Sequence, residues 1–261
     1  MSALAPGEFG LVDRIIGLQR EEVGDVLVGR IPIRDHTRSP VGGLRTGVLL
    51  AAVDAVGGMR CGLACLPRWI VSTNLMVTVG RTDHTGPLRF EGRLLRIGKA
   101  AGVASVDVLD EGAGDRHVAH GLLTTAVLDP EQGPPPLARP VALTPAPLER
   151  APADLASAFA IAEGTGPVTT LAMRDDLRNR WGILHGGVVA VLADVAAERA
   201  LGEGVATDTV LHYLRPTRTG PLEARTSVTG RRADGAVIVV SMHDVGSDDR
   251  QVALASVRVA L

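Results

Sequence analysis

The sequence predicts an α+β protein made of two tandem copies of one domain, each an antiparallel β-sheet wrapped around a central helix. Three observations support this prediction. A proline-rich segment divides the 261 residues, the two parts repeat each other, and each part has one apolar helical segment followed by alternating β-branched runs. Strands and helices do not alternate along the chain, so a parallel sheet is not expected.

The dividing segment contains eight of the sixteen prolines, all between Asp129 and Pro152. Proline lacks an amide hydrogen and disrupts helices and central strands, so these residues predict an extended linker. The expected domains are residues 1–128 and 153–261, joined by the linker 129–152.

The two halves align in two blocks that keep the same order. The first block, at an offset of 140, matches Arg34, Asp35, Gly42, Leu44, Gly47, Val48 and Asp54 with Arg174, Asp175, Gly182, Leu184, Gly187, Val188 and Asp194. The second block, at an offset of 134, matches residues 84–88 with 218–222. The difference of six residues is an insertion in the first half, before the next expected strand. Two matched blocks in one order indicate a duplicated domain.

Each copy has the same order of elements. An apolar strand is expected first, at 26–33 and 168–173. A turn with glycines then leads into a helix, at 47–59 and 187–201, which is apolar on nearly all sides and therefore expected to be buried. Alternating runs bounded by turn residues predict the other strands at 73–79, 87–97, 102–109, 120–128, 209–216, 221–230, 236–245 and 251–261.

Composition excludes several classes of protein. A net charge of -2, with 46% hydrophobic and 21% charged residues, is typical of a soluble globular protein. Basic residues do not cluster and aromatics make up only 2%, so no nucleic-acid partner is expected. No uncharged apolar stretch reaches the length of a membrane span and the N-terminus does not resemble a secretory signal, so we expect no membrane partner and a cytoplasmic location.

Spacing excludes several chemistries. Cys61 and Cys65 have no partner motif for zinc and are expected to pack in the core, so no metal is expected. The GxSxG, HExxH and P-loop patterns are absent, which argues against serine hydrolases, zincins and P-loop enzymes. A phosphate-binding loop at 42–47 stays open as a weak dinucleotide hypothesis.

The segment 179–187 carries the strongest chemical pattern. Gly186 and Gly187 open a helix N-terminus to close approach, where unpaired N–H groups can polarise a carbonyl oxygen. Asp194 follows His185 by nine residues in an apolar helix, where burying a carboxylate is costly unless it is hydrogen-bonded or used. The structural alternative is a satisfied carboxylate and a turn histidine.

Asn179, His185-Gly-Gly and Asp194, followed by Tyr213-Leu-Arg-Pro216 and a Thr-Gly-Pro turn, resemble the hotdog-fold acyl-CoA thioesterases of the phenylacetate type. The resemblance covers about residues 168–261 and is looser in the first half. It implies paired hotdog domains with continuous sheets and with sites between them. The tandem chain would then be a double hotdog, a dimer fused into one polypeptide.

The resemblance implies two composite sites, each with an Asn, a His and a Gly from one domain and an Asp and a hydroxyl residue from the other. The first matches every position, with Asn179, His185, Gly186, Asp54 and Ser72. The second combines Ser39, Arg45 and Thr46 with Asp194 and Ala206, near Thr207 and Thr209. We therefore expect one competent site and one degenerate site, the latter an anion-binding or structural site built on Arg45.

The resemblance also implies roles in thioester hydrolysis. Asp54 would attack the carbonyl or activate water, with an ordinary carboxylate pKa sufficient at pH 7. The Gly186 N–H would stabilise the oxyanion, Asn179 would hold the carbonyl or water, Ser72 would orient water, and His185 would shape the turn or position the thioester.

The expected substrate is an acyl-CoA, with coenzyme A as part of the substrate and no other cofactor. Gly187 and three cations are candidates for binding it, the cations being Arg81, Arg215 and Arg218. The scarcity of aromatic residues other than Trp69 and Trp181 favours an aliphatic acyl group. Further assembly into a homo-oligomer is expected. The alternatives are a non-catalytic acyl-CoA-binding or regulatory double hotdog and a hotdog hydratase.

Overall fold

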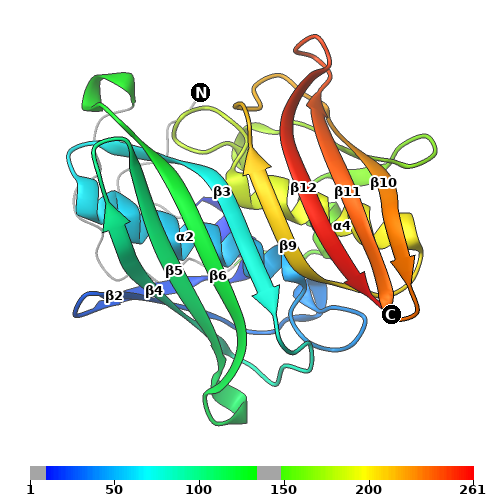
Figure 1. Ribbon diagram of the computed structural model, residues 1–261, viewed down its shortest axis with the longest axis horizontal. Coiled ribbons are helices and arrows are strands. Elements are labelled where there is room, and N and C mark those ends of the chain that lie inside the picture. The colour runs from blue at the N-terminus through cyan, green and yellow to red at the C-terminus, as the bar shows by residue number, and fades with distance from the viewer. Residues whose placement is uncertain (1–9, 134–147) are drawn as a thin grey trace.

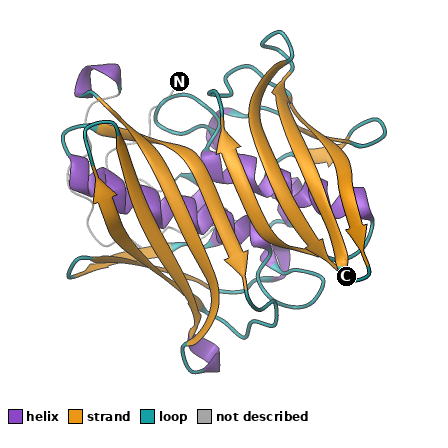
Figure 2. Cartoon of the chain, viewed as in Figure 1, coloured by secondary structure: helices purple, strands orange, loops and turns teal. Residues whose placement is uncertain are grey.

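A computed structural model describes residues 10–133 and 148–261 of the chain, and in this part a 12-stranded antiparallel sheet curves over two long helices (Figures 1 and 2). The first half contains α1 (Leu11–Ile16), β1 (Gln19–Val23), β2 (Val26–Ile31), α2 (Thr46–Cys65), β3 (Trp69–Val79), β4 (Leu88–Ile97), β5 (Ala101–Asp110) and β6 (Arg116–Leu128). The second half contains α3 (Leu155–Ala158), β7 (Ile161–Glu163), β8 (Val168–Leu171), α4 (Gly186–Leu201), β9 (Val205–Tyr213), β10 (Leu222–Arg232), β11 (Gly235–Asp244) and β12 (Arg250–Ala260).

The two halves form one continuous sheet. Its strand order is β1-β2-β4-β5-β6-β3-β9-β12-β11-β10-β8-β7, so each half contributes six neighbouring strands in the same relative order. The halves join where β3 pairs with β9, with Leu75 opposite Leu211 and Val77 opposite Thr209. Helices α2 and α4 lie side by side behind the sheet in Figure 1. The predicted fold class, an α+β pair of sheets each around a central helix, is confirmed.

Glycines on the strands let α2 lie close to the sheet. A Cβ atom on Gly121 of β6 would lie 2.6 Å from Cγ1 of Val53, and one on Gly92 of β4 would lie 2.7 Å from Cγ1 of Val56. Real Cβ atoms do not approach this closely, so bare backbone at these positions is what admits the two valines. Asp54 lies between these two valines in the sequence, and its side chain points toward α4.

The structure differs from the predicted elements at the helix ends and sheet edges. Helix α2 runs over Thr46–Cys65 rather than 47–59, because the insertion of the first half continues the helix and buries Cys61 and Cys65. The short pairs α1/β1 and α3/β7 were not predicted. Strand β1 reads QREEV and is largely exposed at the edge of the sheet, so it lacks the alternation that marks a half-buried strand.

Helix α2, with 20 residues, is long and apolar enough to span a membrane by length and composition alone. A core helix passes the same test, and most of α2 is buried under the sheet. The predicted linker begins with a 3-10 turn at Pro130–Gln132, and its residues 134–147 lie outside the described part of the chain. The predicted domain boundaries and the absence of a membrane partner stay predictions.

Candidate active site

Asp54 of α2 lies against the first turn of α4, where the two halves meet. Its Oδ2 would be 2.9 Å from a Cβ atom on Gly186, so a larger residue there would collide with the carboxylate. Its other oxygen, Oδ1, accepts a hydrogen bond of 2.5 Å from Ser72 Oγ on β3. The structure thus brings together the predicted carboxylate, the hydroxyl and the glycine from different halves of the chain.

The surroundings of Asp54 shift its acidity in opposing directions. Burial raises the pKa of this carboxyl above its ordinary value, while nearby His185 and the hydrogen bond from Ser72 lower the pKa. The net pKa shift is upward. A raised pKa makes the carboxylate a stronger base toward a water molecule, while a larger share of it is protonated at mildly acidic pH.

His185 is the N-cap of α4. Its Nδ1 accepts a hydrogen bond of 3.0 Å from the Gly187 N–H, which satisfies one of the donors at the start of the helix. Nδ1 therefore carries no proton in this arrangement and a neutral ring is protonated at Nε2. The N–H of Gly186, the first residue of α4, has no acceptor within its own helix, which makes it available to an oxyanion.

Asn179 begins the tight loop that leads to α4. Its backbone N–H donates to the Ile183 carbonyl at 2.8 Å, and its side-chain Oδ1 accepts from the Trp181 N–H at 2.9 Å. The loop conformation therefore uses the amide oxygen, and Nδ2 is the atom that can donate to a bound carbonyl or water.

Tyr213, at the end of β9, is a site residue that the sequence analysis missed. Its hydroxyl donates a 3.0 Å hydrogen bond to the Gly186 carbonyl, and burial together with the charge of Asp54 raises its pKa well above the ordinary value. It therefore stays protonated and fixes the first peptide of α4. The sequence held one signal for this residue. The first half has no tyrosine at the matching position, where Val79 stands at the offset of 134.

A cavity of about 670 Å³ opens beside these groups and is lined by Asp54, Ser72, Asn179, His185, Gly186 and Tyr213. Two of the three predicted cations, Arg215 and Arg218, line it as well. Further arginines around it are Arg20, Arg68, Arg178 and Arg180. Arg81 does not line this cavity, because it lies at the pseudo-equivalent position in the other half and pairs with Asp83 at 3.1 Å.

The second predicted cluster is closed by an ion network. Arg45 occupies the position that His185 holds in the first site, and its Nε lies 3.2 Å from Asp194 Oδ2 while its Nη2 pairs with Glu198. Asp194 is fully buried. Burial raises the pKa of Asp194, and burial together with Asp194 raises the pKa of Glu198 to about 7. Arg45 thus serves as a structural cation that compensates one buried and one half-buried carboxyl, not as a free anion site.

The remaining residues of the second cluster are used in local structure. Thr46 Oγ1 donates to the Ala206 carbonyl at 2.5 Å, and Thr207 Oγ1 donates to the Arg258 carbonyl at 3.3 Å. Ser39 is buried, and its Oγ has no hydrogen-bond partner within the residues the structure describes. Among the described residues, no hydroxyl donates to Asp194 as the Ser72 hydroxyl donates to Asp54.

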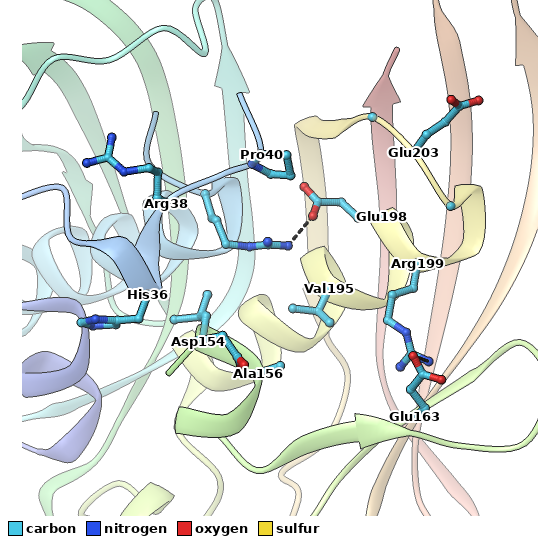
Figure 3. A pocket seen from close by; sticks show the side chains of 14 residues that line it. His36, Arg38, Pro40, Asp154, Ala156, Glu163, Val195, Glu198, Arg199 and Glu203 are labelled. Atoms are coloured by element: carbon cyan, nitrogen blue, oxygen red, sulfur yellow. Dashed lines mark hydrogen bonds and ion pairs between the residues drawn. The ribbon is translucent and has the colours of Figure 1, made fainter. Parts of the chain in front are cut away.

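A second cavity of about 660 Å³ lies next to this cluster, between α4, α3 and the first-half loop (Figure 3). Charged side chains border it, and Figure 3 shows Arg199 close to Glu163, which it pairs with at 2.9 Å. The dashed line in the same figure marks the ion pair between Glu198 and Arg45. Over residues 10–133 and 148–261, no group of three or more His, Cys, Asp or Glu side chains is placed to hold a metal.

The loop at 42–47, the weak dinucleotide hypothesis, packs against the following turn. A Cβ atom on Gly43 would lie 2.1 Å from the Thr82 carbonyl oxygen, and the Leu44 N–H already donates to His84 Nδ1 at 3.0 Å. This loop is therefore closed to a phosphate, and the sheet beside it is antiparallel.

Comparison with known proteins identifies one matching family and several structures of similar fold. Residues 182–249 match the family described as the thioesterase superfamily, and no curated protein sequence matches the chain. The tesB protein of Mycobacterium avium subs paratuberculosis aligns at a TM-score of 0.60 and 15% identity, covering 96% of this chain and 98% of its own.

Two further solved structures also align over most of the chain. An acyl-ACP thioesterase from Bacteroides thetaiotaomicron covers 91% of this chain and 98% of its own at 12% identity and a TM-score of 0.60. The 12:0-ACP thioesterase from Umbellularia californica covers 92% and 100% at 14% identity and the same TM-score of 0.60. The fold is the hotdog fold, the resemblance to the thioesterase superfamily is confirmed, and thioester hydrolysis is supported as the general activity.

Proposed function

We propose that this protein hydrolyses acyl-CoA thioesters at one composite site between its two halves. The observation that carries the proposal is the meeting of Asp54 from one half with Gly186 at the start of α4 from the other, beside Ser72. All three residues line one cavity, and in this proposal they serve as the base, the oxyanion donor and the orienting hydroxyl. The matching cluster around Asp194 lacks the hydroxyl and is occupied by Arg45.

In the proposed reaction, Asp54 takes a proton from a water molecule as the water oxygen bonds to the thioester carbonyl carbon. The carbonyl oxygen gains the negative charge and accepts a hydrogen bond from the Gly186 N–H, an interaction worth about 3 to 4 kcal/mol in comparable sites. The tetrahedral intermediate then collapses, the C–S bond breaks, and the thiolate takes the proton from Asp54. The products are a free acid and coenzyme A.

The other residues position these groups. Asn179 Nδ2 is available to hold the carbonyl or the water, and His185 keeps the first turn of α4 in place through Gly187. Tyr213 holds the Gly186 carbonyl, which fixes the peptide that follows the oxyanion donor. Arg215 and Arg218 at the cavity supply positive charge for the coenzyme A phosphates.

The test is free-thiol release by the full chain from short, medium, long and aryl acyl-CoAs, with acyl-ACP as a parallel substrate. We expect steady release from at least one class of acyl-CoA. Saturable binding without thiol release would favour the non-catalytic acyl-CoA-binding alternative, hydration of an enoyl-CoA without thiol release would favour the hydratase, and release from acyl-ACP alone would reassign the carrier.

Ser72→Ala is expected to move the acidic limb of the pH–rate profile to higher pH. The Ser72 hydroxyl lowers the pKa of Asp54, so its removal raises that pKa and leaves less ionised base at a given mildly acidic pH. The profile of kcat/KM against pH for the wild type and the variant measures this shift. Thr73→Ala is the matched control, because the Thr73 hydroxyl bonds to the Thr124 carbonyl instead. A limb that stays in place in Ser72→Ala, or moves to lower pH, would show that Asp54 is not the titrating base.

A further inference from the structure

The cavity beside Asp54 has two chemically different walls. Apart from Asp54, Ser72 and Thr73, the wall from α2 and β3 is apolar or bare backbone and includes Ala55, Gly58, Met59, Gly62, Leu63 and Ile70. The wall from the second half also has apolar side chains such as Trp181 and Ile183, but it carries four cations, namely Arg178, Arg180, Arg215 and Arg218, with Asp176 among them. The Asp54–Gly186 contact lies where these walls meet. A thioester with its carbonyl at that contact would direct its anionic part toward the arginines and its acyl part along α2.

Gly58 leaves this apolar wall open. It lies four residues after Asp54 on the same face of the helix, about 6 Å further along the axis. A Cβ atom there would have its nearest neighbours at 3.7 and 3.8 Å, in Leu123 and Ile70, which is ordinary van der Waals contact. Side chains larger than alanine would therefore extend into the cavity. Gly62 is one turn further on, and its nearest neighbour is Ile70 at 3.7 Å.

The second cavity provides an internal comparison. At the offset of 140, Glu198 and Arg199 of α4 take the places of Gly58 and Met59. The Glu198 carboxyl pairs with Arg45 and lines that cavity, and Arg199 pairs with Glu163. An apolar chain there would have to lie against charged groups, which is unfavourable. The two cavities therefore differ at the position of Gly58 as well as in their candidate catalytic groups.

We propose that Gly58 is a specificity-determining residue, which admits an unbranched aliphatic acyl chain along the face of α2 that carries Gly58 and Gly62. The inference rests on the proposed thioesterase function and extends it to the class of acyl group. Bulk at residue 58 blocks the path of the chain beyond its first carbons, while a short acyl group still reaches Asp54.

The test compares kcat/KM for acetyl-, butyryl-, hexanoyl-, decanoyl- and benzoyl-CoA in the wild type, Gly58→Leu and Ala64→Leu. Ala64 is exposed on the same helix and does not line the cavity, so its variant adds a leucine side chain without obstruction. We expect the wild type to prefer the longer straight chains. Gly58→Leu should lose about 10-fold or more on decanoyl-CoA and change little on acetyl-CoA, while Ala64→Leu keeps the wild-type profile.

An unchanged chain-length profile in Gly58→Leu would overturn the inference, as would an equal loss on all substrates or a wild-type preference for benzoyl-CoA. If Gly58→Leu does not fold, Gly62→Leu gives a second test one turn further along the same face, and a selective loss on decanoyl-CoA is again expected. Failure of the proposed function would look different, because the wild type would then release no thiol from any acyl-CoA.

Discussion

Replacing Asp54 by asparagine is expected to lower kcat for thioester hydrolysis by about 10²- to 10⁴-fold. The amide has the size of the carboxylate and can still accept the Ser72 hydrogen bond, but it cannot take a proton from water. Its contact with Gly186 is also preserved. Free-thiol release with the best wild-type substrate measures the loss, and thermal unfolding of the variant checks that the fold is intact.

Asp194→Asn is the matched control for this prediction. Asp194 lies at the equivalent position of α4, is buried, and contacts Arg45 instead of a hydroxyl. The variant is expected to keep activity within a few-fold of the wild type, because the cavity beside Asp54 does not include this residue. Loss of activity in Asp194→Asn with full activity in Asp54→Asn would place catalysis in the other composite site.

Arg45→Met is expected to lower the free energy of unfolding by about 3 to 5 kcal/mol, the usual cost of removing one partner from a buried ion pair. The variant leaves the buried Asp194 and the half-buried Glu198 without their cation. Because the pKa of Glu198 is about 7, the carboxyl is largely protonated at pH 5 and needs the cation less. The destabilisation should therefore be larger at pH 8 than at pH 5, as measured by denaturant unfolding at both values.

A triple variant, Arg45→Met with Asp194→Asn and Glu198→Gln, separates charge from packing. It removes the buried charges together, so most of the stability lost in Arg45→Met should return. Its hydrolytic activity should remain near that of the wild type, because none of the three residues lines the cavity of Asp54. A triple variant as unstable as Arg45→Met would show that the arginine acts through packing alone.

The duplicated organisation and the composite arrangement of Asp54 with Gly186 could be predicted because each depends on residue identity at fixed spacing. The repeat showed which positions in the two halves are equivalent, and a continuous sheet then brings α2 and α4 together. The asymmetry of the two clusters could also be read from the sequence, since Arg45 occupies the position of the first half that is equivalent to His185.

Other features depend on distances that the sequence does not encode. Glu198 is an ordinary polar residue of a helix until Arg45, 153 residues away, is found beside it. The raised pKa of Asp54 results from burial, which is a property of the folded protein. Arg81 matches Arg215 in sequence, yet the duplication places it in the opposite half, away from the cavity it was expected to serve. Edge strand β1 was missed because sheet edges do not require alternating side chains.

The stoichiometry of substrate binding shows directly whether the chain has one competent site or two. A non-hydrolysable thioether analogue of the best acyl-CoA substrate can be titrated into the wild-type protein by isothermal calorimetry. We expect about one analogue bound per chain, because Arg45 closes the second site through Asp194 and Glu198. Two equivalent analogues bound per chain would contradict it.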